Sequence, residues 1–139
     1  MAFKIYSKYK PKPCGRSSSI RLCHISRKYS FITFNARAFR DLGMKKGMRM
    51  LFAQDTDTAN WFFAFGDAAN MKDGSLLRPQ IRKGKVTSFK VQNKVVIDKI
   101  CKEVKADRAV FNISMHPKRE RGREWYRILT TTPYRIDEY

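Results

Sequence analysis

Histidine and cysteine are the residue types in this sequence that could support catalysis or metal binding, and both are rare. His24 and His116 could form an acid–base pair for metal-free RNA cleavage, because that chemistry needs little more than two imidazoles and a cation. Their basic neighbours favour phosphate binding without cleavage. Cys14, Cys23 and the histidines could also ligate zinc, but paired zinc ligands usually stand about two to four residues apart. The C-x8-C-H spacing therefore favours separate thiols, with no metal and no cofactor.

The acidic residues are too scattered for hydrolytic chemistry. Asp55, Asp57 and Asp67 flank polar turns, and no pair has the helical spacing that would raise the pKa of one carboxyl for general acid catalysis. The segment QDTD offers two oxygen ligands to Mg²⁺, but no third ligand is evident. The chain also lacks G-x-S-x-G, a phosphate-cradling glycine loop and H-E-x-x-H. We therefore expect a protein that is not an enzyme.

Charge is the most informative property of the composition. The 139 residues include 30 Lys and Arg against 12 Asp and Glu, which gives a formal net charge of +18. A protein this basic binds polyanions. Hydrophobic residues make up 42% of the chain, which is enough for a folded core. No stretch approaches the ~18 to 20 apolar residues of a membrane-spanning helix. We therefore expect DNA or RNA as the partner, and no membrane.

The three cysteines are odd in number and have no paired spacing. Free thiols fit a reducing compartment. We therefore expect a cytoplasmic location, meaning the bacterial cytoplasm or nucleoid, or a phage particle.

Lysines and arginines cluster in segments that read as loops, turns and a short helix, interleaved with aromatic residues. Their long side chains can follow a line of phosphates, and each contact releases a counterion. Arginine also makes bidentate contacts with phosphate or guanine that lysine cannot make. The alternative, a solvated charged face, would need balancing acids, which are missing. The candidate nucleic-acid-binding residues are Lys8, Lys10, Lys12, Arg16, Arg21, Arg27, Lys28, Arg37, Arg40, Lys45, Lys46, Arg82, Lys83, Lys85, Lys118, Arg119, Arg121 and Arg123.

The elements that carry these residues can be read from local patterns. Residues 1–19 are predicted as a basic arm, with an edge strand at 3–9 as the alternative. A hairpin follows, and Asn35 then has the character of a helix N-cap and Gly43 that of a C-cap. The predicted strands are 20–25, 30–34, 48–54, 61–65 and 107–111, a strand led by Trp125 follows a long basic hairpin loop, and the predicted helices are 36–42 and 95–104.

A repeat divides the chain. The strand that contains Arg49 matches the strand that contains Arg108, and each is followed by a hairpin and a strand that begins with Trp61 or Trp125. A core role is favoured for both tryptophans over base stacking. We predict an α+β fold in which two pseudo-repeated β-α-β-β units pack into one compact small domain with a basic N-terminal arm. The expected division is an arm at 1–19, a first unit at 20–66, a basic connector at 67–85 and a second unit at 86–139.

The stretch ITFNARAFRDLGMKKGMRM resembles the swapped-hairpin signature of the AbrB/SpoVT/MraZ transcription factors. The matching features are Asn35 at the helix start, Arg40 before Leu-Gly, and a K-x-G turn that ends at Gly47. The family usually has Pro at the position of Asn35 and an acid at the position of Met48. The resemblance implies DNA binding through Arg40 and the Arg27–Lys28 turn, and two units that act as a dimer or as a tandem pair.

The leading hypothesis is a non-enzymatic DNA-binding protein, either a transcriptional regulator or a nucleoid-like protein. Two alternatives stay open: a protein that binds single-stranded DNA or RNA, and a basic structural component of a phage particle or ribonucleoprotein. A homodimer or assembly into a larger complex fits each of them.

Overall fold

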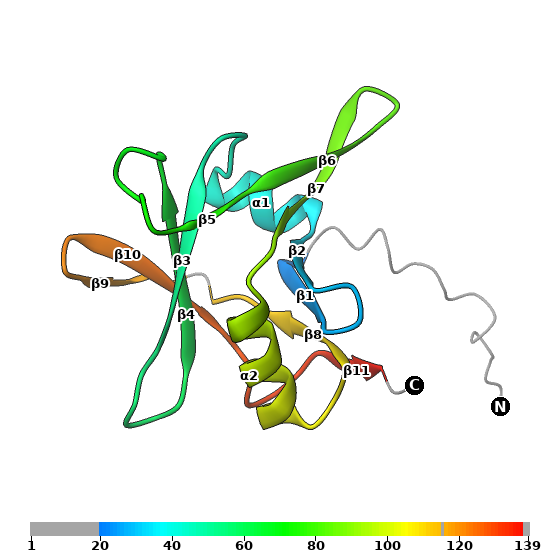
Figure 1. Cartoon of the computed structure of the whole chain (residues 1–139), viewed down its shortest axis with the longest axis vertical. Coiled ribbons are helices and arrows are strands. Elements are labelled where there is room, and N and C mark those ends of the chain that lie inside the picture. Colours follow the sequence, from blue (N-terminus) through cyan, green and yellow to red (C-terminus); the bar gives the residue numbers. More distant parts are fainter. Residues whose placement is uncertain (1–19, 115, 138–139) are drawn as a thin grey trace, which may run out of the picture.

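The computed structural model describes residues 20–114 and 116–137, so the predicted basic arm lies outside the described residues. Within them the chain forms two helices and two antiparallel sheets, an α+β fold made mostly of strands (Figure 1). Neither of these helices is long and apolar enough to cross a membrane.

The larger sheet has six strands, which are β1 (Leu22–Ser26), β2 (Phe31–Phe34), β6 (Arg78–Arg82), β7 (Lys85–Val91), β8 (Arg108–Asn112) and β11 (Arg135–Asp137). Their spatial order is β11-β8-β1-β2-β7-β6. The smaller sheet has five strands, which are β3 (Arg49–Gln54), β4 (Trp61–Gly66), β5 (Ser75–Leu76), β9 (Lys118–Glu120) and β10 (Arg123–Ile128). Their spatial order is β5-β3-β4-β10-β9.

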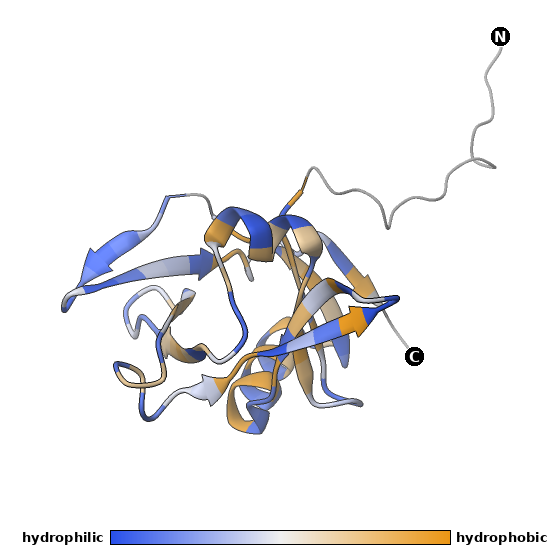
Figure 2. Ribbon diagram, turned by 90° about the horizontal axis from the view of Figure 1, so that it is seen from above, coloured by the Kyte–Doolittle hydropathy of each residue, from blue (hydrophilic) through white to orange (hydrophobic). Residues whose placement is uncertain are grey.

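The two sheets share one hydrophobic core. Phe34 from β2 meets Phe63 from β4 with ring centroids 5.1 Å apart, and neither side chain is exposed. Helix α2 (Lys94–Val104) adds Val96, Ile97 and Ile100 to this core, as its helical periodicity predicted. Hydrophobic segments gather in the interior, whereas the projecting hairpins are mainly hydrophilic (Figure 2).

The predicted first hairpin and helix are confirmed. Strands β1 and β2 pair in antiparallel register, and helix α1 (Ala36–Leu42) follows directly. The side chain of Asn35 accepts a hydrogen bond from the backbone N–H of Ala38, as an N-cap should. Gly43 is left-handed with φ of 79°, and its N–H donates to the carbonyl of Phe39. Local capping chemistry therefore fixes both ends of α1.

The segment predicted as a connector, residues 67–85, is more ordered than expected. It contains β5, β6 and the first residue of β7. Pro79 lies within β6, which is the edge strand of its sheet, where a missing N–H is tolerated. Lys83 and Gly84 join β6 to β7 as a two-residue turn with φ of 51° and 77°. Two positive φ values are what a tight hairpin of this kind needs.

The two predicted β-α-β-β units are interleaved. Each sheet contains strands from both, because β2 pairs with β7 in the larger sheet and β4 pairs with β10 in the smaller one. Strand β1 lies between β2 and β8, so it joins the first segment to the second. Neither segment keeps its strands together in one sheet.

Candidate nucleic-acid interface

The β6–β7 hairpin is a two-stranded ribbon that projects from the domain (Figure 1). Its turn places Arg82 directly opposite Lys85, with Lys83 at the tip. Further along the ribbon, Arg78 is the register partner of Lys90. Like charges directly opposite one another in a sheet are destabilising. The arrangement therefore costs folding free energy, and an anionic partner would relieve that cost.

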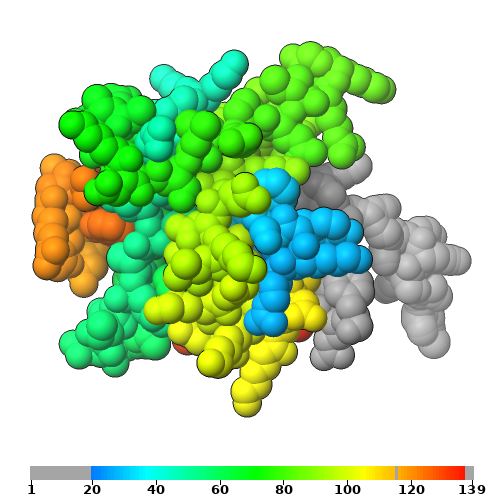
Figure 3. All heavy atoms as spheres, in the orientation of Figure 1, coloured from blue at the N-terminus to red at the C-terminus, as the bar shows by residue number. Residues whose placement is uncertain are grey.

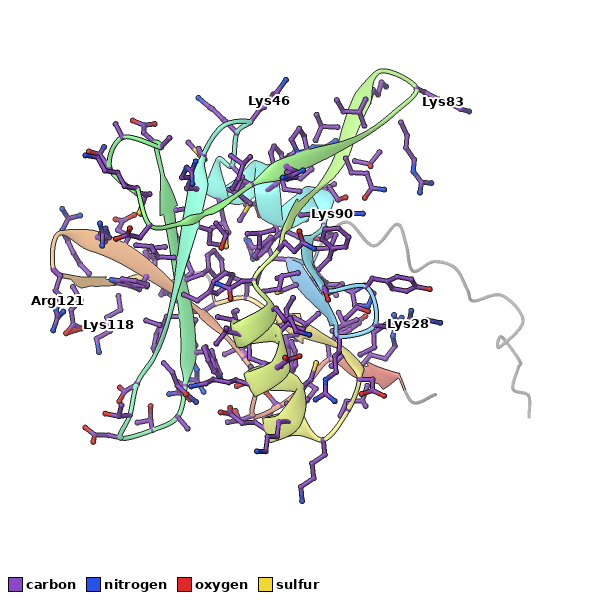
Figure 4. The ribbon with its side chains drawn as sticks, viewed as in Figure 1. Lys28, Lys46, Lys83, Lys90, Lys118 and Arg121 are labelled. Carbon is purple, nitrogen blue, oxygen red and sulfur yellow. The ribbon has the colours of Figure 1, made fainter. Side chains whose placement is uncertain are left out.

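Helix α1 and the turn after it lie beside this ribbon. Phe39 of α1 packs edge-on against Phe89 of β7, with ring centroids 5.1 Å apart. The turn carries Lys45 and Lys46 and ends at Gly47. Lys46 and Lys83 both lie along the upper edge of the molecule in Figure 4, and the same edge is formed by the turn after α1 (cyan) and the ribbon (light green) in Figure 3.

We call this region the helix–hairpin surface. It consists of Arg40, Lys45, Lys46, Arg78, Arg82, Lys83, Lys85 and Lys90. Phe89 faces α1, so its neighbour Lys90 and the register partner Arg78 project from the opposite face of the ribbon.

The charges of the helix–hairpin surface are largely unneutralised. Asp41, the acid of α1, forms ion pairs with Arg21 and Arg37, with each arginine Nε 2.8 Å from Oδ2. No acid occurs between Asp73 and Asp98, a stretch that includes the whole ribbon. Within the described part of the chain, the eight residues of this surface make no ion pair with a carboxylate. The surface therefore presents a concentrated positive potential.

The turn between β1 and β2 lies away from this edge. Arg27 is held in the fold by Asp98 at 3.9 Å and by Asp107 at 3.2 Å. Lys28 stands beside the exposed ring of Tyr29, with Nζ 5.4 Å from the ring centroid. Of the two residues that the family resemblance assigned to this turn, Lys28 is thus the one without an ion pair among the described residues.

The β9–β10 hairpin carries a separate group of cations. Lys118 and Arg121 project on the opposite side from Lys83 in Figure 4. Two of the four predicted cations here have acidic neighbours, Lys118 with Glu120 at 3.4 Å and Arg119 with Glu124 at 3.9 Å. The structure therefore divides the predicted site residues among at least three places on the surface.

Not every predicted basic residue is available to bind nucleic acid, and two basic residues that were not predicted belong to the ribbon. The side chain of Arg21 is only 17% exposed and is bound to Asp41, so it supports the fold. Lys8, Lys10, Lys12 and Arg16 lie outside the described residues. Arg78 and Lys90 belong to the same basic segment as Arg82, Lys83 and Lys85 but were not among the candidate residues, and the structure pairs them across the ribbon. The signal in the sequence was the Lys-Gly turn between two alternating runs.

Among the described residues, those considered for catalysis or metal binding are not gathered into a site, and Cys14 lies outside the described residues. His24 lies in β1, in the middle of the larger sheet, and His116 lies in the loop before β9. No group of three or more metal-ligating side chains occurs among residues 20–114 and 116–137. Cys23 and Cys101 are both buried, and burial raises the pKa of each thiol. A hydrogen bond from the backbone N–H of Asp57 lowers the pKa of Asp55, which marks a loop-stabilising carboxylate.

Comparison with known proteins returned no match: no protein-family model, no curated protein and no solved structure is significantly similar to this chain.

Proposed function

We propose that this protein is a non-enzymatic, duplex-DNA-binding protein and that the helix–hairpin surface is its main contact. The observation that carries the proposal is the acid-free ribbon, in which Arg78 faces Lys90 and Arg82 faces Lys85. Folding places these like charges together at a cost, which phosphate binding would offset. The buried, free thiols of Cys23 and Cys101 fit a reducing cytoplasm, where DNA is available.

The shape of the surface fits a duplex. The major groove, about 12 Å wide, admits a two-stranded ribbon such as the β6–β7 hairpin. In that pose Lys83 at the tip would reach base edges or the far phosphates, and Arg40 with Lys45 and Lys46 would contact the near backbone. Phosphate contacts position a protein on the duplex, whereas base contacts give specificity.

We further propose that the chain is a tandem pair of related units, as the resemblance to the AbrB/SpoVT/MraZ factors implies. The helix N-caps Asn35 and Asn93 stand 58 residues apart. In the pairing of β2 with β7, Ile32 corresponds to Lys90 and Thr33 to Val91 under the same shift of 58. The register pair Ile32–Val91 is therefore converted into the register pair Thr33–Lys90 when the two units are interchanged. The pairing of β4 with β10 has the same property. With a shift of 64 residues, which is the distance between Trp61 and Trp125, interchange of the units converts the register pair Phe62–Arg127 into the register pair Phe63–Tyr126. This regularity supports a pseudo-two-fold relation between the units.

A second candidate function is binding of single strands. Two contacts favour it, the ammonium of Lys90 at 4.5 Å from the ring centroid of Phe31 and that of Lys28 beside Tyr29, which is 57% exposed. Aromatic rings next to cations can stack bases while the cation holds the phosphate.

The experiment that separates these functions is a titration of the full chain with three ligands of equal length and related sequence: duplex DNA, single-stranded DNA and single-stranded RNA. We expect the duplex to bind tightest, and its affinity to fall by about 10³ or more between about 50 and 200 mM salt. A chain that lacks residues 1–19 should bind more weakly, with a smaller salt slope but the same preference. Equal affinity for the three ligands would exclude groove recognition and favour the single-strand function.

A further inference from the structure

A cavity of about 710 Å³ lies between the β9–β10 hairpin, strand β4 and the loop after β4. The hairpin (orange) and the loop (green) are neighbours at the left of Figure 3, and Nη2 of Arg123 donates to the carbonyl of Asn70 at 3.2 Å. The volume is in the range of pockets that hold small molecules. Arg121, which lines the cavity, lies at the left of Figure 4, away from Lys83 at the upper right.

One side of the cavity is aromatic. Phe65 of β4 and Tyr126 of β10 line it, with their ring centroids 6.0 Å apart and their planes inclined by 27°. Both rings also stack on Phe63, which is fully buried and anchors them to the core. Because the anchored rings are only partly buried, their exposed parts are a fixed apolar platform. Nucleobases have the planar faces that bind such platforms.

The other side of the cavity is cationic. Arg119, Arg121 and Arg123 line it, with Glu124 as the single lining acid. Glu124 lies 3.9 Å from Arg119, and both side chains are more than half exposed, so water weakens this pair. Arg121 has no ion pair within the described part of the chain. Arg121, and the N–H groups of Arg123 other than the Nη2 that contacts Asn70, therefore remain to bind an anion, and paired guanidinium donors suit phosphate.

We propose that this cavity is a nucleotide-binding site, which takes one nucleoside monophosphate unit with its base against Phe65 and Tyr126 and its phosphate on Arg121 and Arg123. The unit is a free mononucleotide or the 5′-phosphorylated end of a single strand, which share this chemistry. The site does not depend on duplex binding by the helix–hairpin surface, and each can exist without the other. The neighbouring pocket of about 460 Å³, on the side of Phe62 and Trp125, shares Arg121 and also has Lys118, but its two acids, Asp55 and Glu120, make it fit an anion less well.

The phosphate and the base should contribute separately. Isothermal titration calorimetry of the full chain would compare adenosine 5′-monophosphate with adenosine and with inorganic phosphate. We expect the nucleotide to bind at least about tenfold more tightly than either half, because only the nucleotide contacts both sides of the cavity. The site is absent if the nucleotide does not bind, or if inorganic phosphate binds equally well.

Variants assign the binding to this cavity. Arg121→Gln should weaken nucleotide binding by about tenfold, since it removes a charge-assisted contact. Arg121 is in a left-handed turn, with φ of 54°, so Arg123→Gln, on strand β10, is a second variant that removes the other phosphate contact without that constraint. Lys46→Gln is the matched control, because it removes one exposed charge from the helix–hairpin surface. Equal losses in Arg121→Gln and Lys46→Gln would mean non-specific charge attraction and would overturn the proposal.

Competition between ligands identifies the source of the nucleotide, and the same variants show whether the two sites are independent. A single strand with a 5′-phosphate that outcompetes both the free nucleotide and a 5′-hydroxyl strand identifies a strand end as the ligand, and the reverse order identifies a free nucleotide. Arg121→Gln should leave duplex affinity nearly unchanged, whereas Lys46→Gln should lower it. If the wild-type chain binds duplex DNA but no nucleotide, the nucleotide site is overturned; if it binds nucleotide but no duplex, the proposed function is overturned.

Discussion

The side-chain oxygen of Asn35 accepts a hydrogen bond from the backbone N–H of Leu22, 13 residues earlier, at 3.1 Å. The same oxygen caps α1 through Ala38, and the side-chain nitrogen donates to the carbonyl of Ile20 at 2.8 Å. One amide therefore fixes the start of α1 and the entry of β1 together. Because α1 carries Arg40, this residue also helps to position that side chain.

Replacement of Asn35 by Ala should be more destabilising than the equivalent change at the second cap. Asn35→Ala removes three side-chain hydrogen bonds, and we expect a loss of about 2 to 3 kcal/mol in the free energy of unfolding. Asn93→Ala removes the cap to Val96 and a long contact to Ser75, and should cost about 1 kcal/mol. Urea denaturation of both variants measures the difference. Equal losses of unfolding free energy would mean that the hydrogen bonds from Asn35 to Leu22 and Ile20 contribute nothing to stability.

Glu103 should couple α2 to the smaller sheet. Its carboxylate accepts the indole N–H of Trp61 and the side-chain amide of Gln54, each at 2.9 Å. Trp61 is 4% exposed, so Glu103→Ala leaves a buried donor unsatisfied, at a cost of about 1 to 2 kcal/mol.

A double-mutant cycle with Trp61→Phe isolates the indole contact. The loss of unfolding free energy caused by Glu103→Ala should be smaller in the Trp61→Phe background, because the indole N–H is absent there. In the wild-type background, Glu103→Gln should cost less than Glu103→Ala because it keeps one acceptor. Additive losses would show that the two side chains do not interact.

The thiols of Cys23 and Cys101 should be unreactive in the folded protein. Burial raises the pKa of both, and only the thiolate reacts with disulfide reagents. In a Cys14→Ser background, neither remaining thiol should react at pH 8 until urea unfolds the chain. Because the folded thiols hold their protons while unfolded thiols ionise near pH ~8.5, stability should fall as the pH rises above that value. Rapid reaction of either thiol without urea would contradict the packing around it.

Arg40 and Arg37 make a matched pair on α1. Arg37 pairs with Asp41, whereas Arg40 makes no ion pair among the described residues and lies 5.7 Å from the centroid of the Phe39 ring. Arg40→Ala should weaken duplex binding about three- to tenfold with little change in Tm. Arg37→Ala should affect binding less and cost only about 0.3 to 0.5 kcal/mol. Fluorescence anisotropy and thermal melting measure both, and a large fall in Tm for Arg40→Ala would make that residue structural.

Local chemistry made the first half of the fold predictable. A capping side chain, a left-handed glycine and alternating apolar residues act over a few positions, so α1, its caps and the β1–β2 hairpin could be read directly from residues 20–43. Helix α2 was readable for the same reason, because its buried face repeats at the helical period.

Long-range pairing was not predictable in this way. Residues 67–85 were interpreted as a basic connector, so β6 was not predicted; the tolerance of an edge position for Pro79 depends on a strand order that no local pattern encodes. The ion pairs of Arg27 involve Asp98 and Asp107, which the fold brings from α2 and from the end of the loop after it. The candidate site was the hardest part to predict, because acidic residues distant in sequence decide which lysines and arginines remain without an ion pair.

The most direct test of the helix–hairpin surface is the salt dependence of duplex affinity in a variant with Arg82, Lys83 and Lys85 all changed to Gln. The control is a variant with Lys94, Lys99 and Lys102 changed to Gln, which removes the same charge from α2. We predict that the hairpin variant loses about 2 to 3 units from the slope of log affinity against log salt concentration, and that the control keeps nearly the wild-type slope. Equal slopes in the two variants would contradict the assignment of duplex binding to the ribbon.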